Sequence, residues 1–333
     1  MTGGEPYAIP AWRVVLDGQD LTDRFRPRLL ELSLCEARGG EADQLDLQIH
    51  DHDGRMALPR RGVELSVAIG WHDAGLIDKG TFKVDEVEHS GSPDVITIRA
   101  RSADLTHSMR TRRERSWHDV TLGAVVRNLA GEHGLQARIA PALAGIAIPH
   151  LDQTGESDVN LLTRLGQRHD AVATVKAGAL LFMPIGSGTT ASGEPLPGAV
   201  LRRRDGDRHR FSQVDRDKYS GVRAFWHHKA GASRKSVLVG ESGDAKRLRD
   251  TYSNEAEARQ QADAEWKRLQ RGAAQLSYSL ALGRADLYPE QKIRVEGFKA
   301  EIDGTGWLVS KVTHRITGSG GFTSDLELET ALE

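Results

Sequence analysis

The chain has 333 residues, of which 38% are hydrophobic and 28% are charged, a composition typical of a soluble protein with a sizeable core. Its 45 Lys and Arg residues nearly balance its 47 Asp and Glu residues, so the formal net charge is −2. This balance excludes the basic excess of a dedicated nucleic-acid-binding protein. No apolar run approaches the length of a membrane span, and a single cysteine, Cys35, cannot form an internal disulfide.

The first hundred residues alternate apolar and polar side chains. Three such runs begin at Trp12, Leu45 and Val63, and turn signals such as Asp53-Gly54 separate them. Alternation gives a strand one buried and one wet face, which is typical of an antiparallel sheet. We predict a first small β-barrel over residues 1–110.

The middle of the chain has a helical pattern. Apolar residues recur at helical spacing after Thr121 and after Ser157, each of which can cap a helix, and a hairpin is expected over 171–183. We predict an α/β insert, a helix-hairpin subdomain with its linker, over residues 111–205.

Arginines cluster on both sides of this insert, in residues 110–115 and 202–210. The first cluster is interpreted as part of a connector over 106–115. Both clusters are either solvated linkers or contacts with a partner. Because they flank the insert on both sides, we expect them to meet near the rim of an assembled ring. The candidate interface residues are Arg112, Arg113, Arg203 and Arg204.

The last third returns to alternating strands. Asn254 with Glu257 three residues later is a capping box, so one long helix is expected to run to Gly272. The remaining runs, including the closing one from Phe322 to Leu328, indicate strands. We predict a second β-barrel with one long helix over residues 206–333, so the fold class is mainly β with an α+β insert.

Two stretches of the chain repeat each other without a gap. Residues 77–89 and 302–314 share Ile-Asp followed by aromatic-x-Val-x-x-Val-x-His. Because residues two apart share one face of a strand, the spacing changes parity between the two valines, which predicts a β-bulge in each copy. The repeat predicts two similar β-barrels and a shared structural role for the two histidines, such as a hydrogen bond at the bulge. The matched residues are Phe82, Val84, Val87, His89, Trp307, Val309, Val312 and His314.

No group of residues predicts catalysis. Residues 51–54 begin like a calcium loop, but Gly62 stands where that loop needs a glutamate. The residues His150, Asp152, His169 and Asp170 do not have the spacing of a zinc site. Phosphate-loop, metalloprotease and nucleophile-elbow motifs are absent from the sequence. We therefore expect no catalytic residues, no metal and no cofactor, and we do not expect an enzyme.

An ordered set of short motifs resembles one known family. The set is Leu58-Pro59-x-x-Gly62, Gly70-Trp71, Glu156-Ser157-Asp158-x-x-Leu161-Leu162-x-Arg164-Leu165, His169-Asp170-Ala171, Trp266-Lys267-Arg268-Leu269, Leu287-Tyr288-Pro289, residues 307–314 and residues 321–328. In this order the motifs resemble the late control protein D family of contractile-tailed phages. Those proteins are baseplate hubs related to the hub part of VgrG proteins of type VI secretion, and the likeness covers nearly the whole chain.

The resemblance implies a structural protein of the virion tail baseplate, made and assembled in the bacterial host cytoplasm. The family's hub is a homotrimer with two similar β-barrels per subunit, and this pseudo-six-fold ring joins a six-fold tail tube to a three-fold spike. The chain ends without a β-helix repeat, so the spike is expected to be a separate protein.

The implied partners are other copies of the chain, the spike protein, and a tail tube or tube-initiator protein, with a tape measure protein as a further candidate. Neither sequence-specific nucleic acid nor stable membrane insertion is expected. The alternative function is a baseplate protein that binds or degrades peptidoglycan, with residues 116–183 as its glycan-binding module.

Overall fold

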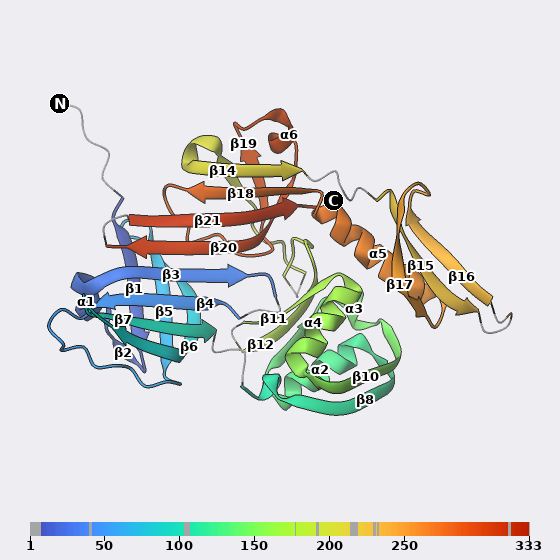
Figure 1. Cartoon of the computed structure of the whole chain (residues 1–333), viewed down its shortest axis with the longest axis horizontal. Coiled ribbons are helices and arrows are strands. Elements are labelled where there is room, and N and C mark those ends of the chain that lie inside the picture. The colour runs from blue at the N-terminus through green and yellow to red at the C-terminus, as the bar shows by residue number, and fades with distance from the viewer. Residues whose placement is uncertain are drawn as a thin grey trace.

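The structure, a computed structural model, describes residues 8–39, 42–102, 107–176, 178–190, 193–213, 219–228, 231, 233–318 and 321–332. Within these residues the strands form four sheets, and the largest has 13 strands. The fold is mainly β with an α/β insert, as predicted (Figure 1). The 13-stranded sheet holds the two β units side by side, and the insert lies against both of them.

The N-terminal β unit contains the elements up to residue 102. They are β1 (Pro10–Leu16), β2 (Gln19–Asp20), α1 (Thr22–Phe25), the 3-10 helix η1 (Arg26–Arg28), β3 (Leu29–Ala37), β4 (Gln44–His50), β5 (Glu64–Trp71), β6 (Gly75–Ser90) and β7 (Val95–Ser102). The strand order is β3-β4-β7-β6-β5-β1-β2. The alternating apolar side chains meet in one core, in which Leu32, Leu47 and Ile69 have no exposed surface.

The C-terminal β unit has a core of its own around Trp307, Tyr278 and Leu326. Its elements are β13 (Ala199–Arg202), the 3-10 helix η3 (Arg203–Asp205), β14 (Gly206–Gln213), β18 (Ala274–Leu280), β19 (Lys292–Glu296), α6 (Ala300–Asp303), β20 (Trp307–Thr317) and β21 (Gly321–Thr330). The strand order is β14-β18-β21-β20, with β19 beside the start of β20 and β13 beside β19.

The insert follows a short 3-10 helix, η2 (His107–Arg110), and forms a third core. Its elements are β8 (Arg112–Thr121), α2 (Leu122–Glu132), β9 (Gln136–Ile139), α3 (Pro141–Ala144), β10 (Ala147–Ser157), α4 (Asp158–His169), β11 (Ala171–Lys176) and β12 (Ala179–Pro184). The two predicted helices and the hairpin are confirmed, and the hydroxyls of Thr121 and Ser157 accept the backbone N–H groups expected of helix caps.

The connector predicted over 106–115 is wrong from Arg112 onward, because β8 begins there and pairs along its length with β10. The pattern was hidden because the inward positions of β8 carry arginines instead of apolar residues. Arg113 and Arg115 turn toward the insert and form ion pairs with Glu132 and Asp158. A charged residue can take an inward position in a strand when it has such partners.

Residues 221–271 form an arm that projects from the C-terminal β unit (Figure 1). It contains β15 (Gly221–His228), β16 (Ser233–Gly240), β17 (Ala245–Tyr252) and the long helix α5 (Glu255–Arg271), which packs on the three strands. The predicted cap is present, since the Asn254 side chain accepts the Glu257 N–H at 2.9 Å. We predicted these strands as part of the second barrel, but they form a separate sheet. The alternation of apolar and polar residues does not reveal which sheet a strand joins. Of the helices in the described ranges, none combines the length and hydropathy needed to cross a bilayer.

Five strands of the two β units correspond one to one. β3, β4, β5, β6 and β7 match β14, β18, β19, β20 and β21, and each matched pair of neighbours is antiparallel. The registers also agree: Val84 lies opposite Ala100, and its counterpart Val309 lies opposite Leu328. The correspondence ends at the first strand, because β1 runs antiparallel to β5 whereas β13 runs parallel to β19.

The predicted β-bulges are present in both copies of the repeat. The pairing of β6 with β7 shifts between Val84 and Glu86, and the pairing of β20 with β21 shifts between Val309 and Lys311. These are corresponding positions, one residue after the first valine of each copy. The parity change in the sequence therefore identified a real irregularity of the sheet.

Candidate functional site: the polar junction between the two β units

The two β units are joined by a continuous strand pairing, which we call the seam. Residues 311–317 of β20 pair antiparallel with residues 31–37 of β3, so that His314 lies opposite Leu34 and Thr313 opposite Cys35. One more bond, from the Arg38 N–H to the Ser310 carbonyl at 3.0 Å, extends the seam beyond β3. Backbone hydrogen bonds along a whole strand fix the orientation of one unit relative to the other.

A buried polar cluster lies under the seam, formed by Glu36 of β3, Lys79 of β6, and His314 and Ser324 of the C-terminal unit. The Lys79 ammonium donates to Glu36 Oε2 at 2.6 Å and lies 3.3 Å from His314 Nε2. His314 Nδ1 lies 2.8 Å from the Ser324 hydroxyl. The Lys79, Glu36 and His314 side chains are 5%, 7% and 0% exposed, so the cluster is closed off from water.

The charge states of this cluster follow from its contacts. Burial alone would raise the pKa of Glu36, but contact with His314 and the charges of Lys79 and Lys176 outweigh burial and hold that pKa at about 2. Burial lowers the pKa of His314, so its ring is neutral at pH 7. A neutral ring protonated at Nε2 can donate to Glu36 Oε2, 3.4 Å away, while Nδ1 accepts from the Ser324 hydroxyl, whose oxygen accepts the Arg284 N–H. Every polar group of the cluster therefore has a partner, which is the condition for burying charge without a large penalty.

Aromatic packing closes one end of the seam. The Trp71 indole N–H donates to the Gly283 carbonyl at 2.8 Å, and its ring lies 5.2 Å from that of Phe322. Phe322 belongs to the C-terminal unit but is buried in the core of the N-terminal unit. Gly283 has no room for a side chain, because a Cβ there would overlap the Phe322 ring. The two cores thus interlock at this end.

A second charged cluster lies at the other end of the seam, around Arg38. This guanidinium forms ion pairs with Glu290 and Glu329 of the C-terminal unit. Glu290 has a φ of 73°, a backbone conformation that favours glycine, and its counterpart in the N-terminal unit is Gly62 with a φ of 88°. Glu290 Oε2 also accepts the Gly186 N–H at 2.7 Å, so both oxygens have partners that offset the strained backbone. Burial raises the pKa of Glu290, which Arg38 opposes.

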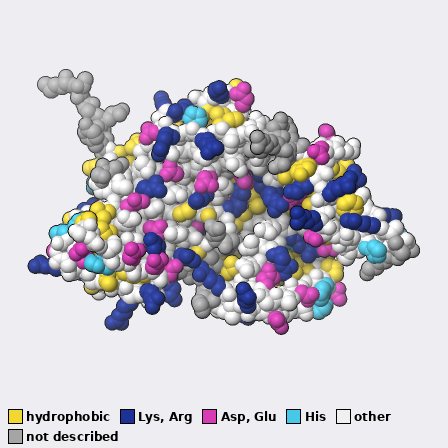
Figure 2. Space-filling model, viewed as in Figure 1, with side chains coloured by type: hydrophobic (Ala, Val, Ile, Leu, Met, Phe, Trp, Pro, Cys, Tyr) yellow, Lys and Arg dark blue, Asp and Glu magenta, His cyan; other side chains and the backbone are white. Residues whose placement is uncertain are grey.

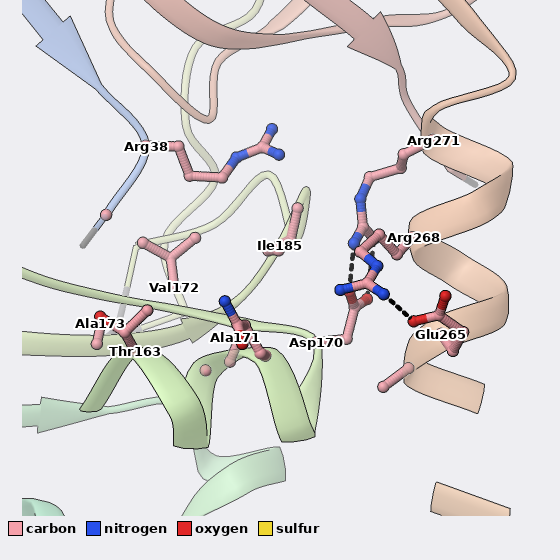
Figure 3. Close-up of a pocket in the computed structure, with 14 residues that line it drawn as sticks. Arg38, Thr163, Asp170, Ala171, Val172, Ala173, Ile185, Glu265, Arg268 and Arg271 are labelled. Atoms are coloured by element: carbon pink, nitrogen blue, oxygen red, sulfur yellow. Dashed lines mark hydrogen bonds and ion pairs between the residues drawn. The ribbon is translucent and has the colours of Figure 1, made fainter. Parts of the chain in front are cut away.

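The insert joins this cluster through Asp170 and Arg271. Figure 3 shows Arg271, near the end of α5, reaching Asp170 at the end of α4. Arg271 Nη1 donates to Asp170 Oδ2 at 2.9 Å, and Arg271 Nε lies 3.3 Å from Glu329. A pocket of about 250 Å³ separates these groups from Arg38 (Figure 3). Ion pairs thus connect the N-terminal unit, the C-terminal unit, the insert and α5 at one place.

Comparison with known proteins identifies the family. A family model described as phage tail baseplate hub (GPD) matches residues 43–320. The chain is also 44% identical to a probable baseplate hub protein of Escherichia phage 186, over 97% of this chain and 93% of the relative. The chain belongs to the phage tail baseplate hub family. A probable baseplate hub protein of Escherichia phage P2 is 44% identical over 97% of the hub chain described here and 94% of its own length. The hub is a component of the phage virion tail.

Solved structures share the fold of the hub chain. A 43 kDa tail protein of prophage MuSo2 from Shewanella oneidensis superposes with a TM-score of 0.68 at 16% identity, covering 96% of this chain and 98% of that one. A component of the Escherichia coli type VI secretion system, described as similar to phage T4 tail proteins gp27 and gp5, gives 0.61 at 15% identity, covering 92% and 74%. These identities are low, so the likeness shows the shared architecture.

The four predicted interface arginines of the hub differ in exposure. Arg112 and Arg204 are exposed. Arg113 is half-buried against Glu132, and Arg203 donates to the Gly206 carbonyl at 2.8 Å, so both already have partners inside the chain. Within one chain the two clusters do not meet: β8 and β14, which hold or adjoin them, lie at opposite sides of the hub (Figure 1). Figure 2 shows both signs of charge interspersed over this face.

The repeat residues also divide into two kinds. Six of them are apolar and line the two cores, with Phe82, Trp307 and Val309 almost fully buried. The shared role expected for the two histidines is wrong. His314 is buried in the seam cluster, whereas His89 is 42% exposed and lies 3.7 Å from Asp51. Neither is at the bulge, and they differ because β3 covers β20 at His314 and nothing in the described chain covers β6 at His89.

The considered metal ligands have other partners. His150 contacts Asp152 and His118 in the insert, and Asp170 pairs with Arg271. Within the described ranges, no group of three or more His, Cys, Asp or Glu side chains is arranged for a metal. Sequence reasoning missed Glu36, Lys79, Arg38 and Glu290. One signal was available, because Glu36 has the same parity as the buried Leu32 and Leu34.

Proposed function

We propose that the hub chain acts as a homotrimer whose six β units form a pseudo-six-fold ring between a six-fold tail tube and a three-fold spike. The partners are two further copies of the chain, a separate spike protein, a tail tube or tube-initiator protein, and a tape measure protein as a further candidate. The chain divides into a first β unit (1–110), an insert with its linker (111–205), and a second β unit with a long helix (206–333).

One observation carries this proposal: the matched strands, registers and bulges of the two units, joined by a rigid seam. A ring made of three identical chains has three-fold symmetry, and two similar units per chain make it six-fold in every feature that they share. The seam supports the same conclusion, because the strand pairing of residues 311–317 with residues 31–37 and the ion pairs of Arg38 with Glu290 and Glu329 hold the two units at one fixed angle.

We propose a structural, non-catalytic role for the same residues. The buried acids and bases described above are occupied in ion pairs, within the N-terminal unit for Glu36 and Lys79 and between units for Arg38 and Arg271. Groups held in this way are poor general acids or bases because their protons are already committed. The alternative of peptidoglycan binding has no comparable support, since the buried polar side chains of the insert that we described are held in ion pairs within the insert or with Arg271 of α5.

Counting chains in the assembled particle tests the proposal. Hub complexes released from purified tails should have a mass equal to three chains by native mass spectrometry, with the tube and spike proteins as separate species. A hub of two, four or six chains would contradict the ring. A zymogram of the full chain on peptidoglycan should stay uncleared, and a cleared band that depends on insert residues would overturn the structural role.

A further inference from the structure

The seam uses one particular edge from each β unit. The N-terminal unit contributes β3, and the C-terminal unit contributes residues 311–317 of β20. Each of these strands has a counterpart in the other unit. β14 is the counterpart of β3, and residues 86–90 of β6 are the counterpart of the seam part of β20.

The match between β3 and β14 is detailed enough to carry residue numbers. Both strands begin with a register shift against their neighbour, between Leu29 and Glu31 in β3 and between Gly206 and Arg208 in β14. After the shift, Leu34 lies opposite Leu45, and in the same place Phe211 lies opposite Leu276. Phe211 is therefore the counterpart of Leu34, and Ser212 that of Cys35.

Among the described residues, the two counterpart edges have no strand partner. β14 pairs only with β18, and residues 86–90 of β6 pair only with β7, within the part of the chain that the structure describes. An open edge presents unpaired N–H and C=O groups, which proteins normally cover or block with charges and bulges. Here the two edges are complementary, because their counterparts, β3 and residues 311–317 of β20, already pair with each other in the seam.

Side-chain exposure follows the same division. Leu32, Leu34, Val312 and His314 are buried where the seam covers them. Their counterparts His209, Phe211, Val87 and His89 are partly or fully exposed. The counterpart positions also face inward, but among the described residues no neighbouring strand covers them as the seam covers Leu32, Leu34, Val312 and His314.

We propose that β14 of one subunit pairs antiparallel with residues 86–90 of β6 in the next subunit, in the register of the seam. This rests on the proposed trimer and names the surface that closes it. In that register Phe211 lies opposite His89, Ser212 opposite Glu88, and Arg210 opposite Ser90. The contact is head to tail, so a third copy can close a ring and leave no edge of this kind open.

The charges on the two edges fit this pairing. Glu86 and Glu88 are exposed on β6, where both lie within ion-pair distance of Arg99. Arg208 and Arg210 are exposed on β14 without an ion-pair partner among the described residues. In the proposed register Arg210 lies diagonal to Glu88, a separation that long side chains bridge. The buried acid of the seam has a neutral counterpart here: Gln213 of β14 takes the place of Glu36. The subunit contact thus lacks a buried ion cluster.

Disulfide trapping tests the proposal with an internal control. Thr313 and Cys35 lie directly opposite each other in the seam, so Thr313→Cys should form a disulfide within one chain, since opposed strand residues are at bridging distance. Their counterparts are Glu88 and Ser212. The test variant is Glu88→Cys/Ser212→Cys in a Cys35→Ser background, assembled into tails and oxidised.

Non-reducing gels should show the test variant as covalent dimers and trimers, and the Thr313→Cys control as a monomer. Mixed assembly of the two single variants, Glu88→Cys and Ser212→Cys, should give dimers but no trimers. Glu88→Cys/Gln213→Cys should not cross-link, because neighbouring residues face opposite sides of a strand.

The outcomes separate the two proposals. Suppose that hub complexes have the mass of three chains. If Glu88→Cys/Ser212→Cys then gives no cross-link, or Glu88→Cys/Gln213→Cys cross-links equally well, the proposed register is wrong and the trimer is still supported. A hub that remains one chain in the particle overturns both. If the cysteine variants fail to enter tails, oxidation of the purified full chain at high concentration decides: a Glu88–Ser212 ladder supports the pairing, and its absence there overturns it.

Discussion

At the scale of single residues, the junction depends on charges that are buried and matched. Glu36 faces the interior of the seam, and its negative charge is stable there because Lys79 reaches across from β6. A buried ion pair contributes little against an apolar replacement, yet it is costly to break from one side. Both charges belong to the N-terminal unit, so the C-terminal unit enters the cluster through His314, and misaligned units would leave the Glu36–Lys79 pair without that contact.

Removing Lys79 alone should therefore destabilise the hub strongly. We expect Lys79→Met to lower the free energy of unfolding by about 3–5 kcal/mol, because Glu36 is left buried with only the more distant Lys176, 3.8 Å away, as its cation. The double variant Glu36→Gln/Lys79→Met should recover part of that loss. Urea unfolding checks this, with Arg294→Met as a control, because its ion pair is exposed and should be worth less than about 1 kcal/mol. Equal losses of unfolding free energy in Lys79→Met and Arg294→Met would contradict the role of the cluster.

The same cluster predicts acid sensitivity. The pKa of Glu36 is lowered from 4.5 to about 2 in the folded chain, so the unfolded chain binds more protons between these values. The stability that Glu36 contributes is complete above about pH 4.5 and is lost as the pH falls through about 2, a change on the order of 3 kcal/mol. Because burial lowers the pKa of His314, its contribution also declines on acidification, beginning near pH 6.5.

Unfolding free energies measured at pH 7, 4.5 and 3 check this prediction. The Glu36→Gln variant should lose less stability between pH 4.5 and 3 than the parent chain. Parallel curves for the two proteins would show that other carboxylates dominate.

At the scale of elements, the chain uses arginines where a simple pattern expects apolar residues. Arg113 and Arg115 lie inward on β8, and Arg271 is 4% exposed near the end of α5. Alternation and helical spacing predicted the capped helices, the hairpin and both bulges, because those patterns depend on neighbours in sequence. They could not predict β8, the separate sheet of the arm or the partners of Arg38, because these depend on residues brought together by the tertiary fold.

Arg271 should control how firmly the insert is attached. Replacing it in Arg271→Met leaves Asp170 and Glu329 without their shared cation, so α4 and β11 should exchange their amide hydrogens faster, while β4 and β7 should be unchanged. Arg268→Met is the matched control on the same helix, because that side chain is 62% exposed and pairs with Glu265. Hydrogen exchange followed by mass spectrometry measures both. Uniform protection in Arg271→Met would mean that apolar packing alone holds the insert.

At the scale of the whole molecule, the repeat in the sequence is a repeat in the fold from Phe82 to His89 and from Trp307 to His314. Its first part is not, because Ile77 and Asp78 lie in β6 whereas Ile302 and Asp303 lie in α6. What the sequence could not indicate was which edges remain open, because β3 and β14 share no obvious residue pattern: Leu32 and Leu34 stand where His209 and Phe211 stand. Their equivalence emerges from register and from the bulge that begins each strand.

Charge reversal on the open edge should impair assembly of the hub. We expect Arg208→Glu/Arg210→Glu to reduce incorporation into tails several-fold, most strongly at low salt where charges are least screened. Adding Glu86→Arg/Glu88→Arg should restore part of it. The thermal midpoint of the isolated chain should stay within a few degrees of the parent, because these side chains are exposed.

The exposed arginines predicted earlier provide the comparison. Arg112→Glu and Arg204→Glu report on partner contacts away from the open edges, whereas Arg113 and Arg203 are engaged within the chain. Normal incorporation of the Arg208/Arg210 variant, together with a defect in Arg112→Glu, would move the interface from β14 to the insert.

The opposite directions of β1 and β13 have a consequence for partner choice. In the proposed ring of three chains, any surface made of the five shared strands would recur every sixth of a turn, whereas a surface that includes β1 or β13 would recur only every third of a turn. A partner with six equivalent contacts can therefore bind equivalently only to the shared strands. A partner with three equivalent contacts can distinguish one kind of unit from the other only where it contacts β1 or β13. A single reversed strand is enough to let one ring present two different rotational periods.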